Sequence, residues 1–406
     1  MNKIMVVGIG SIGTLIGASL VKAGVEVTFA GRDRSSYTKQ IKQFGLFLFN
    51  SRGEKTQILP NTKKVRFVDI TEKLEEVFEI IVVAVKSNCL AAVAPYIHAH
   101  SDCNSIIFHA QNGIPYWWFA DNNYLSDLNP SLLARIGSRP YLHSVDPDGE
   151  IMALLGDRHL VGCVVKAPCS KTPWGRVEVK KSPKMSVGLV TPQQSYFQKS
   201  TVEQLCQLLS NNGLTTTYHE NIRTEVGQKL AINLATNVLS ALTDCAIAEL
   251  TANAYVNNAI GIIVAELRQI FLIYGIKKAD LPSEAKVYAY ITEPGSQRHL
   301  PSLAQDFARR RQGEISLITA PVEMAEIAGI KTPTLDSLAV LLQFGQSYAL
   351  NRASSKFNIL TFDPAFGYCV LTDEACQSPA LDKSKISALL ARLIQINVSA
   401  LEQNVA

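Results

Sequence analysis

The first 34 residues constrain the fold of this chain more than any other segment. Residues 3–7 form a short apolar run typical of a buried strand, and it leads directly into G-x-G-x-x-G at 8–13. A helix-compatible stretch over 14–22 and a second strand-like run over 25–30 follow. A glycine-rich turn between a strand and a helix is the usual start of a doubly wound parallel sheet that binds a dinucleotide.

The residues of this motif have separate tasks. Gly8 permits the tight turn, Gly10 lets a pyrophosphate approach the backbone, and Gly13 lets the helix pack against the strand. Ser11 and Ile12 contribute backbone N–H groups at the positive N-terminal end of the helix. We therefore expect these five residues to bind the phosphates of the cofactor.

The residue at the end of the second strand distinguishes the two nicotinamide cofactors. An NAD(H) site usually has Asp or Glu there, which accepts hydrogen bonds from the ribose 2′-hydroxyl. This chain has Arg32, with Arg34 close by. Because a guanidinium group suits a 2′-phosphate, the sequence favours NADP(H). Asp33 between the two arginines keeps NAD(H) open.

Composition indicates a soluble globular protein with two domains. The chain has 406 residues, of which 47% are hydrophobic and 18% are charged. The net charge of +4 is spread along the chain, which gives no case for nucleic acid or a membrane surface as a partner. Glu266 and Arg268 interrupt the apolar run over 259–273, so no apolar run reaches the roughly 20 residues of a membrane span.

The cysteines and histidines show no pattern for disulfides or metal. The eight cysteines form no C-x-x-C pair, and no signal sequence precedes the first strand-like run. We therefore expect reduced thiols in a cytoplasmic protein. His98 and His100 form the one metal-like pair in the sequence, but they lack nearby partners, so no metal site is expected.

The pattern along the chain predicts an α/β domain, an all-α domain and an extension. Strand-like and helical runs alternate over 1–219, the pattern of a Rossmann-type doubly wound sheet, with an irregular, β-rich elaboration at about 114–190. A helical domain spans 220–348, and residues 349–406 have mixed signals. The helices expected in the second domain lie at 221–242, 252–275, 300–328 and 334–347.

Two polar positions follow apolar, strand-like runs in the first domain. The run at 80–85 ends at Lys86, and the run at 105–108 is followed by Gln111-Asn112-Gly113. Ligands of doubly wound sheets bind beyond the carboxyl ends of the strands. The sequence therefore places Lys86 and Asn112 at the ligand-binding edge.

A polar stripe follows one face of the first helix in the second domain. Lys229, Asn233 and Asn237 are spaced i, i+4 and i+8 among apolar neighbours. A solvated helix face would normally carry more charge, so this stripe is a candidate site. Ser302 and Glu314 lie further on, in a pattern that predicts a helix; taken alone, each is more typical of a surface residue.

Taken in order, these motifs resemble the ketopantoate reductase (2-dehydropantoate 2-reductase) family over residues 1 to about 345. The matching pieces are G-x-G-x-x-G at 8–13, Val85-Lys86, Gln111-Asn112-Gly113, Lys229-x-x-x-Asn233-x-x-x-Asn237, and Ser302-Leu-Ala-Gln-Asp306 with Glu314 after it. The resemblance implies a Rossmann domain followed by a helical domain like the C-terminal domain of 6-phosphogluconate dehydrogenase. It implies NADPH-dependent reduction of ketopantoate to D-pantoate, on the route to pantothenate and coenzyme A.

The resemblance also implies roles for individual residues. Lys229 would donate a proton to the developing alkoxide, and Glu314 would hydrogen-bond the reacting hydroxyl and set the charge state of the lysine. Asn112 would bridge cofactor and substrate. The remaining roles are substrate binding by Asn233, Asn237 and Ser302, cofactor binding by Lys86, and recognition of the 2′-phosphate by Arg32.

Several features depart from the family pattern and leave the substrate open. His299 and Ile247 occupy positions where the family often has asparagine. The aromatic segment 116–119 could reshape the pocket, although packing is the favoured interpretation. The alternatives are an NADPH-dependent reductase of another 2-keto acid, an opine-type dehydrogenase, or a non-catalytic NADP(H)-sensing protein. A small-molecule substrate is expected as partner, and the sequence leaves a homodimer open.

Overall fold

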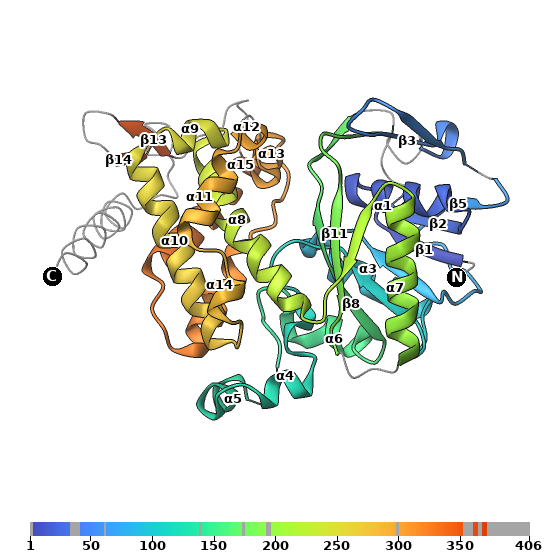
Figure 1. The fold of residues 1–406 in the computed structure, drawn as a ribbon, viewed down its shortest axis with the longest axis horizontal. Coiled ribbons are helices and arrows are strands. Elements are labelled where there is room, and N and C mark those ends of the chain that lie inside the picture. Colours follow the sequence, from blue (N-terminus) through green and yellow to red (C-terminus); the bar gives the residue numbers. More distant parts are fainter. Residues whose placement is uncertain are drawn as a thin grey trace. The chain divides into compact units, whose positions relative to one another are not determined.

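The chain divides into two compact units. The structure is a computed structural model that describes residues 3–32, 41–60, 62–137, 140–172, 175–191, 196–297, 300–351, 360–363 and 368–371. The first unit comprises Met1–Asp127 and Gly137–Val226, and the second comprises Leu128–Ile136 and Gly227–Ala406 (Figure 1).

An eight-stranded sheet forms the centre of the first unit. Its strands are β1 (Lys3–Val7), β2 (Glu26–Gly31), β5 (Val65–Asp69), β6 (Ile80–Val83), β7 (Ile106–His109), β8 (His159–Lys166), β11 (Lys184–Leu189) and β12 (Thr215–Tyr218). The parallel strands follow the order β5-β2-β1-β6-β7-β8, and β11 joins antiparallel to β8. This is the Rossmann order, in which the strand sequence reverses between β1 and β6. The predicted doubly wound sheet is therefore confirmed.

Helices cover both faces of this sheet. On one face, α1 (Ser11–Lys22) and α7 (Tyr196–Asn211) pack on alternate strand residues such as Val82 and Phe108. The intervening residues are also buried, as the near-continuous apolar strands require. Since parallel crossovers are right-handed, α3 (Leu90–Ala99) lies on the opposite face, where it packs with α6 (Glu150–Leu155) (Figure 1).

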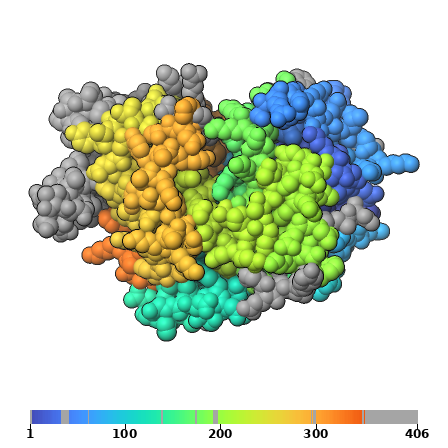
Figure 2. Space-filling model, in the orientation of Figure 1, coloured from blue at the N-terminus to red at the C-terminus, as the bar shows by residue number. Residues whose placement is uncertain are grey.

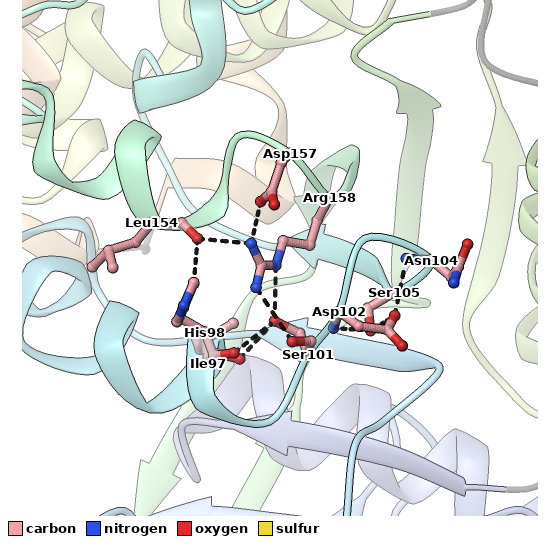
Figure 3. Close-up of polar contacts among 9 residues, drawn as sticks. All are labelled: Ile97, His98, Ser101, Asp102, Asn104, Ser105, Leu154, Asp157 and Arg158. Atoms are coloured by element: carbon pink, nitrogen blue, oxygen red, sulfur yellow. Dashed lines mark hydrogen bonds and ion pairs between the residues drawn. The ribbon is translucent and has the colours of Figure 1, made fainter.

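Arg158 joins the end of α3 to the turn before β8 (Figure 3). Its Nε and Nη2 donate to the side chain and carbonyl oxygens of Ser101, at 3.1 and 3.2 Å, and its Nη1 donates to the carbonyl oxygen of Leu154 at 3.1 Å. The side chain of Asp157 pairs with the same guanidinium. His98 bonds the Leu154 carbonyl as well, at 2.8 Å. This histidine thus contributes to the packing of α3 on α6.

A second, four-stranded sheet covers the outer side of α1. The strands that form it correct the prediction of a β-rich elaboration at 114–190. It contains β3 (Leu46–Phe49), β4 (Lys55–Ile58), β9 (Cys169–Thr172) and β10 (Arg176–Val179), in the order β4-β3-β10-β9. The elaboration predicted at 114–190 therefore mixes separate structures. Its central strands, β8 and β11, belong to the main sheet, and residues 114–158 are mainly helical. In the space-filling view, β3 and β4 (blue) and α7 (yellow-green) form part of one face of the first unit (Figure 2).

The second unit is helical, as predicted. Its helices are α5 (Pro130–Ile136), α8 (Ile222–Thr243, from Gly227 on), α9 (Ile247–Thr251), α10 (Ala254–Ile273), α11 (Glu284–Thr292), α12 (Pro294–Gln297), α13 (Ser302–Ala308), α14 (Ser316–Ala328) and α15 (Pro333–Asn351). Strands β13 (Leu360–Asp363) and β14 (Tyr368–Leu371) form an antiparallel hairpin. The single helix predicted over 300–328 is wrong. Residues 309–315 interrupt it, because Arg310 takes a left-handed φ of 52° that ends α13.

The contact boundaries of the units differ from the boundary expected at 219–220. The chain changes unit inside α8, between Val226 and Gly227. The segment with α5 also belongs to the second unit, where Arg135 Nη1 donates to the carbonyl oxygen of Ala328 at 2.6 Å. This bond satisfies a carbonyl at the end of α14 and adds a positive charge to that negative helix end.

Helix α10 is long and apolar enough to cross a membrane by length and composition, although only 39% of its most apolar window is buried. Its polar contacts are those of a core helix. The buried carboxylate of Glu266 accepts hydrogen bonds from the backbone N–H groups of Thr334 and Leu335, at 3.0 and 2.9 Å. Those groups lie in the first turn of α15, where an anion is stabilised. We assign α10 to the core of the second unit.

Candidate active site

The glycine loop after β1 is held in a tight space between neighbouring strands. Gly8 has φ 104°, and its N–H donates to the carbonyl oxygen of Ala30 at 2.9 Å. A β-carbon on Gly8 would lie 2.8 Å from the backbone of Ala84, and one on Gly13 would lie 1.9 Å from the Gly8 oxygen. These two positions therefore require glycine, both for conformation and for space.

Gly10 faces open space. Apart from its chain neighbours, no atom of the described residues lies within 4 Å of the position that a β-carbon would take. The backbone N–H groups of Ser11, Ile12 and Gly13 belong to the first helical turn, whose N–H groups have no partner within the helix. An open helix N-terminus of this kind accommodates the phosphates of a dinucleotide.

Arg32 follows β2 directly and is exposed. The preceding residue, Gly31, packs against the side chain of Ile9, since a β-carbon there would lie 2.7 Å from Ile9 Cδ1. This contact brings the end of β2 against the glycine loop. Asp33 and Arg34 lie outside the described residues.

Lys86 and Asn112 follow the carboxyl ends of two adjacent parallel strands, β6 and β7. Lys86 is half-buried and precedes a short 3₁₀ helix (Ser87–Cys89). Gln111 Nε2 donates to the carbonyl oxygen of Val85 at 3.1 Å, which ties the two strand ends together. The first unit thus brings Lys86, the half-buried Asn112 and the glycine loop to one edge of its sheet.

A buried histidine and tyrosine bracket the loop that carries Asn112. The hydroxyl of Tyr116 lies 2.8 Å from Nε2 of His109, and the two rings meet edge to face. Burial lowers the pKa of His109 to about 3, so the ring is neutral near pH 7. The aromatic segment 116–119 forms a 3₁₀ helix whose four side chains are all buried. The packing interpretation of these aromatics is therefore confirmed.

The polar stripe predicted in the second unit lies along α8. Lys229 and Asn233 are half-buried, whereas Asn237 is buried and its Oδ1 accepts a hydrogen bond from Thr236 Oγ1 at 3.2 Å. Ser240 continues the polar surface one turn further and is fully buried. A single serine in an apolar helix is a weak signal, so Ser240 does not stand out in the sequence.

Ser302 and Glu314 come from α13 and the loop that follows it. Ser302 is the first residue of α13 and is exposed, while Glu314 is buried. The predicted helical position of Glu314 is wrong, since α14 begins at Ser316. Gly313 packs against Leu303, because a β-carbon on the glycine would lie 2.4 Å from Leu303 Cδ1. The loop before Glu314 therefore rests on the helix that carries Ser302.

Of the two residues that depart from the family pattern, the structure describes Ile247 but not His299. Ile247 begins α9 and is buried. His299 lies outside the described residues. Among the described residues, no group of three or more His, Cys, Asp or Glu side chains could hold a metal ion.

The chemistry of the predicted residues differs between the units. The first unit offers backbone N–H groups, Lys86 and Arg32, which suit an anionic dinucleotide. The second unit offers an ammonium group, a carboxylate and amides, which suit proton transfer and binding of a small polar molecule. A nicotinamide-dependent oxidoreductase requires groups of both kinds.

Comparison with known proteins gives matches in both units. A family model described as ketopantoate reductase PanE/ApbA matches residues 4–115, and one described as ketopantoate reductase PanE/ApbA C terminal matches residues 221–346. A 2-dehydropantoate 2-reductase from Mesorhizobium japonicum is 26% identical over 348 residues, which cover 84% of this chain and 97% of the relative.

Solved structures show the same fold at lower identity. A D-mandelate dehydrogenase in complex with NADH and anilino(oxo)acetate aligns with TM-score 0.66 and 19% identity, over 86% of this chain and 99% of its own. A dimeric ketopantoate reductase from Staphylococcus aureus aligns with TM-score 0.61 and 17% identity, over the same shares of the two chains. At these identities the similarity shows the fold alone.

Proposed function

The chain belongs to the ketopantoate reductase family, and on this premise we propose that it reduces ketopantoate to D-pantoate with NADPH. The observation that carries the proposal is the match of both family models, one in the cofactor unit and one in the helical unit. The reaction would supply D-pantoate for the synthesis of pantothenate and coenzyme A.

The geometry of the first unit supports binding of NADP(H). The space above Gly10 and the open end of α1 fit a diphosphate, and Arg32 has the charge that a 2′-phosphate requires. Lys86 adds a second cation at the same edge of the sheet, and Asn112 would orient the ligand through its amide. The reduced nicotinamide of the bound cofactor supplies the hydride.

In this proposal, side chains of the second unit donate the proton and bind the substrate. Hydride addition to a 2-keto group creates an alkoxide, and the ammonium of Lys229 would stabilise it and donate a proton. Glu314 would accept a hydrogen bond from the resulting hydroxyl. The amides of Asn233 and Asn237 and the hydroxyl of Ser302 would bind the hydroxyl and carboxylate ends of ketopantoate.

A second candidate function is reduction of a different 2-keto acid. A D-mandelate dehydrogenase with the same fold binds NADH and anilino(oxo)acetate, so the fold accommodates ligands other than ketopantoate. His299 and Ile247, where the family often has asparagine, also permit a different substrate. Such an enzyme would turn over phenylglyoxylate or 2-ketoisovalerate faster than ketopantoate.

The experiment that separates these functions measures oxidation of NADPH by absorbance, with ketopantoate, phenylglyoxylate, pyruvate and 2-ketoisovalerate as substrates. NADH replaces NADPH in parallel reactions. The proposal predicts the highest kcat/KM for ketopantoate with NADPH. A higher value for another 2-keto acid would establish the second candidate, and oxidation of NADH at the same efficiency would overturn the cofactor assignment.

The proposal includes a cytoplasmic homodimer. The structural similarity to a dimeric ketopantoate reductase from Staphylococcus aureus supports the assembly. Light scattering on the purified chain tests it, and a monomer mass at assay concentrations would contradict it.

A further inference from the structure

Two buried side chains of opposite charge hold the first turn of α8 within the first unit. Arg223 donates from Nε to the carbonyl oxygen of Trp118 at 2.9 Å and from Nη1 to that of Val190 at 3.1 Å. Its guanidinium carbon lies 4.2 Å from the ring centroid of Tyr124. Glu225, two residues further along the helix, is also buried.

Glu225 is bound by side chains from three separate segments. Its Oε2 accepts hydrogen bonds from Ser186 Oγ on β11, at 2.7 Å, and from Lys166 Nζ at the end of β8, at 3.0 Å. His219 Nδ1, just after β12, lies 3.7 Å from Oε1. Strands β8 and β11 lie side by side in the sheet (Figure 1). The carboxylate therefore attaches the helix to two adjacent strands, β8 and β11, and lies beside the turn that follows β12.

The carboxyl group is held in its charged form. Burial raises the pKa of Glu225, but the hydrogen bonds from Ser186 and Lys166 and the positive charge of Lys166 bring it below the ordinary value. The Glu225 side chain is 10% exposed and that of Lys166 is 40% exposed, so loss of the lysine would leave a largely buried carboxylate with one cationic partner fewer.

The sheet beneath this turn is shaped to receive the helix. Gly162 of β8 and Gly188 of β11 are paired in register. A β-carbon on Gly162 would lie 2.9 Å from Ile222 Cγ1, and one on Gly188 would lie 3.0 Å from Ile222 Cβ. Two glycines opposite each other thus allow the first residue of α8 to approach the sheet closely. The glycines set how closely the first turn of α8 approaches the sheet. The charged side chains set the rotation of that turn about the helix axis.

We propose that Glu225 is a positioning residue that sets the direction of Lys229. Helix α8 is continuous from Ile222 to Thr243, and Lys229 follows Glu225 by four residues, which places both on the same face one turn apart. Rotation of the first turn about the helix axis would move the lysine with it. The inference rests on the proposed function, in which Lys229 donates the proton.

The test uses substitutions in the full chain that keep side-chain size. Glu225→Gln retains an acceptor for Ser186 and loses the ion pair, Lys166→Gln removes the partner, and Lys166→Arg restores a cation. Glu76→Gln is the control, since Glu76 pairs with Lys3 and Arg66 in the same unit, away from α8. We measure kcat, the KM for the 2-keto acid, the Kd for NADPH, and amide hydrogen exchange over residues 222–230.

For both glutamine variants at 225 and 166 we expect kcat to fall about tenfold or more, because small misplacement of a reacting group is costly. The Kd for NADPH should stay within about twofold, because the glycine loop is untouched. Amide exchange over 222–230 should accelerate in both. Lys166→Arg and Glu76→Gln should resemble the unmodified protein in all four measurements.

Two results would overturn the inference. One is a kcat within about twofold of the unmodified protein for Glu225→Gln. The other is an unchanged amide exchange over 222–230. If the unmodified protein reduces no 2-keto acid, the proposed function fails, and amide exchange alone then decides whether Glu225 holds α8. A protein that reduces ketopantoate while Glu225→Gln keeps its kcat would retain the proposed function and lose the positioning role.

Discussion

Gly13 lies so close to the carbonyl oxygen of Gly8 that a β-carbon on Gly13 would be 1.9 Å from that oxygen. The start of α1 and the end of β1 are thus in direct backbone contact. Gly10 lies between them in the sequence, and in the part of the chain that the structure describes only its chain neighbours come within 4 Å of its β-carbon position. The same motif therefore contains a glycine required by the protein itself and one that leaves space for a ligand.

This contrast predicts different effects for two alanine substitutions. Gly13→Ala should lower the melting temperature, because the clash is with backbone atoms. Gly10→Ala should leave the melting temperature unchanged, since Gly10 has φ −94°, which alanine accepts. It should weaken NADPH binding about 10- to 100-fold, as expected for an added methyl in a close contact. Titration of both variants with NADPH, beside thermal unfolding, makes the comparison; normal NADPH binding by Gly10→Ala would contradict the placement of the diphosphate.

Arg32→Ala should weaken the binding of NADPH and leave the binding of NADH nearly unchanged. Loss of charge-assisted hydrogen bonds to the 2′-phosphate should raise the Kd for NADPH about 10- to 100-fold. NADH lacks this phosphate, so its Kd should change little. Fluorescence titration with each cofactor measures both values, and Arg52→Ala, an exposed arginine in the hairpin between β3 and β4, is the matched control. Equal weakening of the two cofactors would exclude recognition of the 2′-phosphate by Arg32.

Lys229→Ala and Glu314→Ala should each reduce kcat, because a positioned proton donor contributes about 10²–10⁴-fold. Lys229→Ala should retain NADPH affinity, since the lysine belongs to the second unit. Steady-state kinetics with ketopantoate, together with circular dichroism as a check on folding, supply the measurement. A near-normal kcat for Lys229→Ala would remove the lysine from the reaction.

The buried His109 should make the first unit sensitive to acid. Its pKa is lowered to about 3 in the folded protein, against 6.5 when unperturbed. The folded state therefore binds fewer protons, so the stabilisation is present above pH 6.5 and is lost as the pH falls toward 3. At pH 5 the loss relative to pH 7 should be about 2 kcal/mol.

His109→Gln removes this titration and retains a polar group for Tyr116. The drop in unfolding free energy between pH 7 and pH 5 should be about 2 kcal/mol smaller in the variant than in the unmodified protein. Urea unfolding at both pH values measures it. An identical drop in the two proteins would show that His109 does not titrate as described.

The fold of the first unit could be predicted where local sequence determines it. Strand, glycine turn and helix follow one another at the N-terminus, so β1, α1 and β2 are evident from residues 3–30 alone. Strands β3 and β4 were missed. They form a local hairpin, but β3 joins the rest of its sheet by pairing with β10, more than a hundred residues away. Pairing at such separation depends on tertiary contacts that local patterns do not report.

The candidate site could be predicted only in part for the same reason. The stripe from Lys229 to Asn237 is visible because helix period alone aligns it. The loop position of Glu314 depends on the backbone of Arg310 and on packing of Gly313 against Leu303, and neither has a local signal. Glu225 was missed because its partners come from strands β8 and β11 and from the turn after β12.

Transfer of deuterium from NADPH to product tests the central claim most directly. The purified chain is incubated with ketopantoate and NADPH deuterated at the transferable position of the nicotinamide, and the products are analysed by mass spectrometry and chiral chromatography. The proposed function predicts D-pantoate that carries deuterium at C2. Absence of pantoate under conditions in which the protein binds NADPH would contradict it.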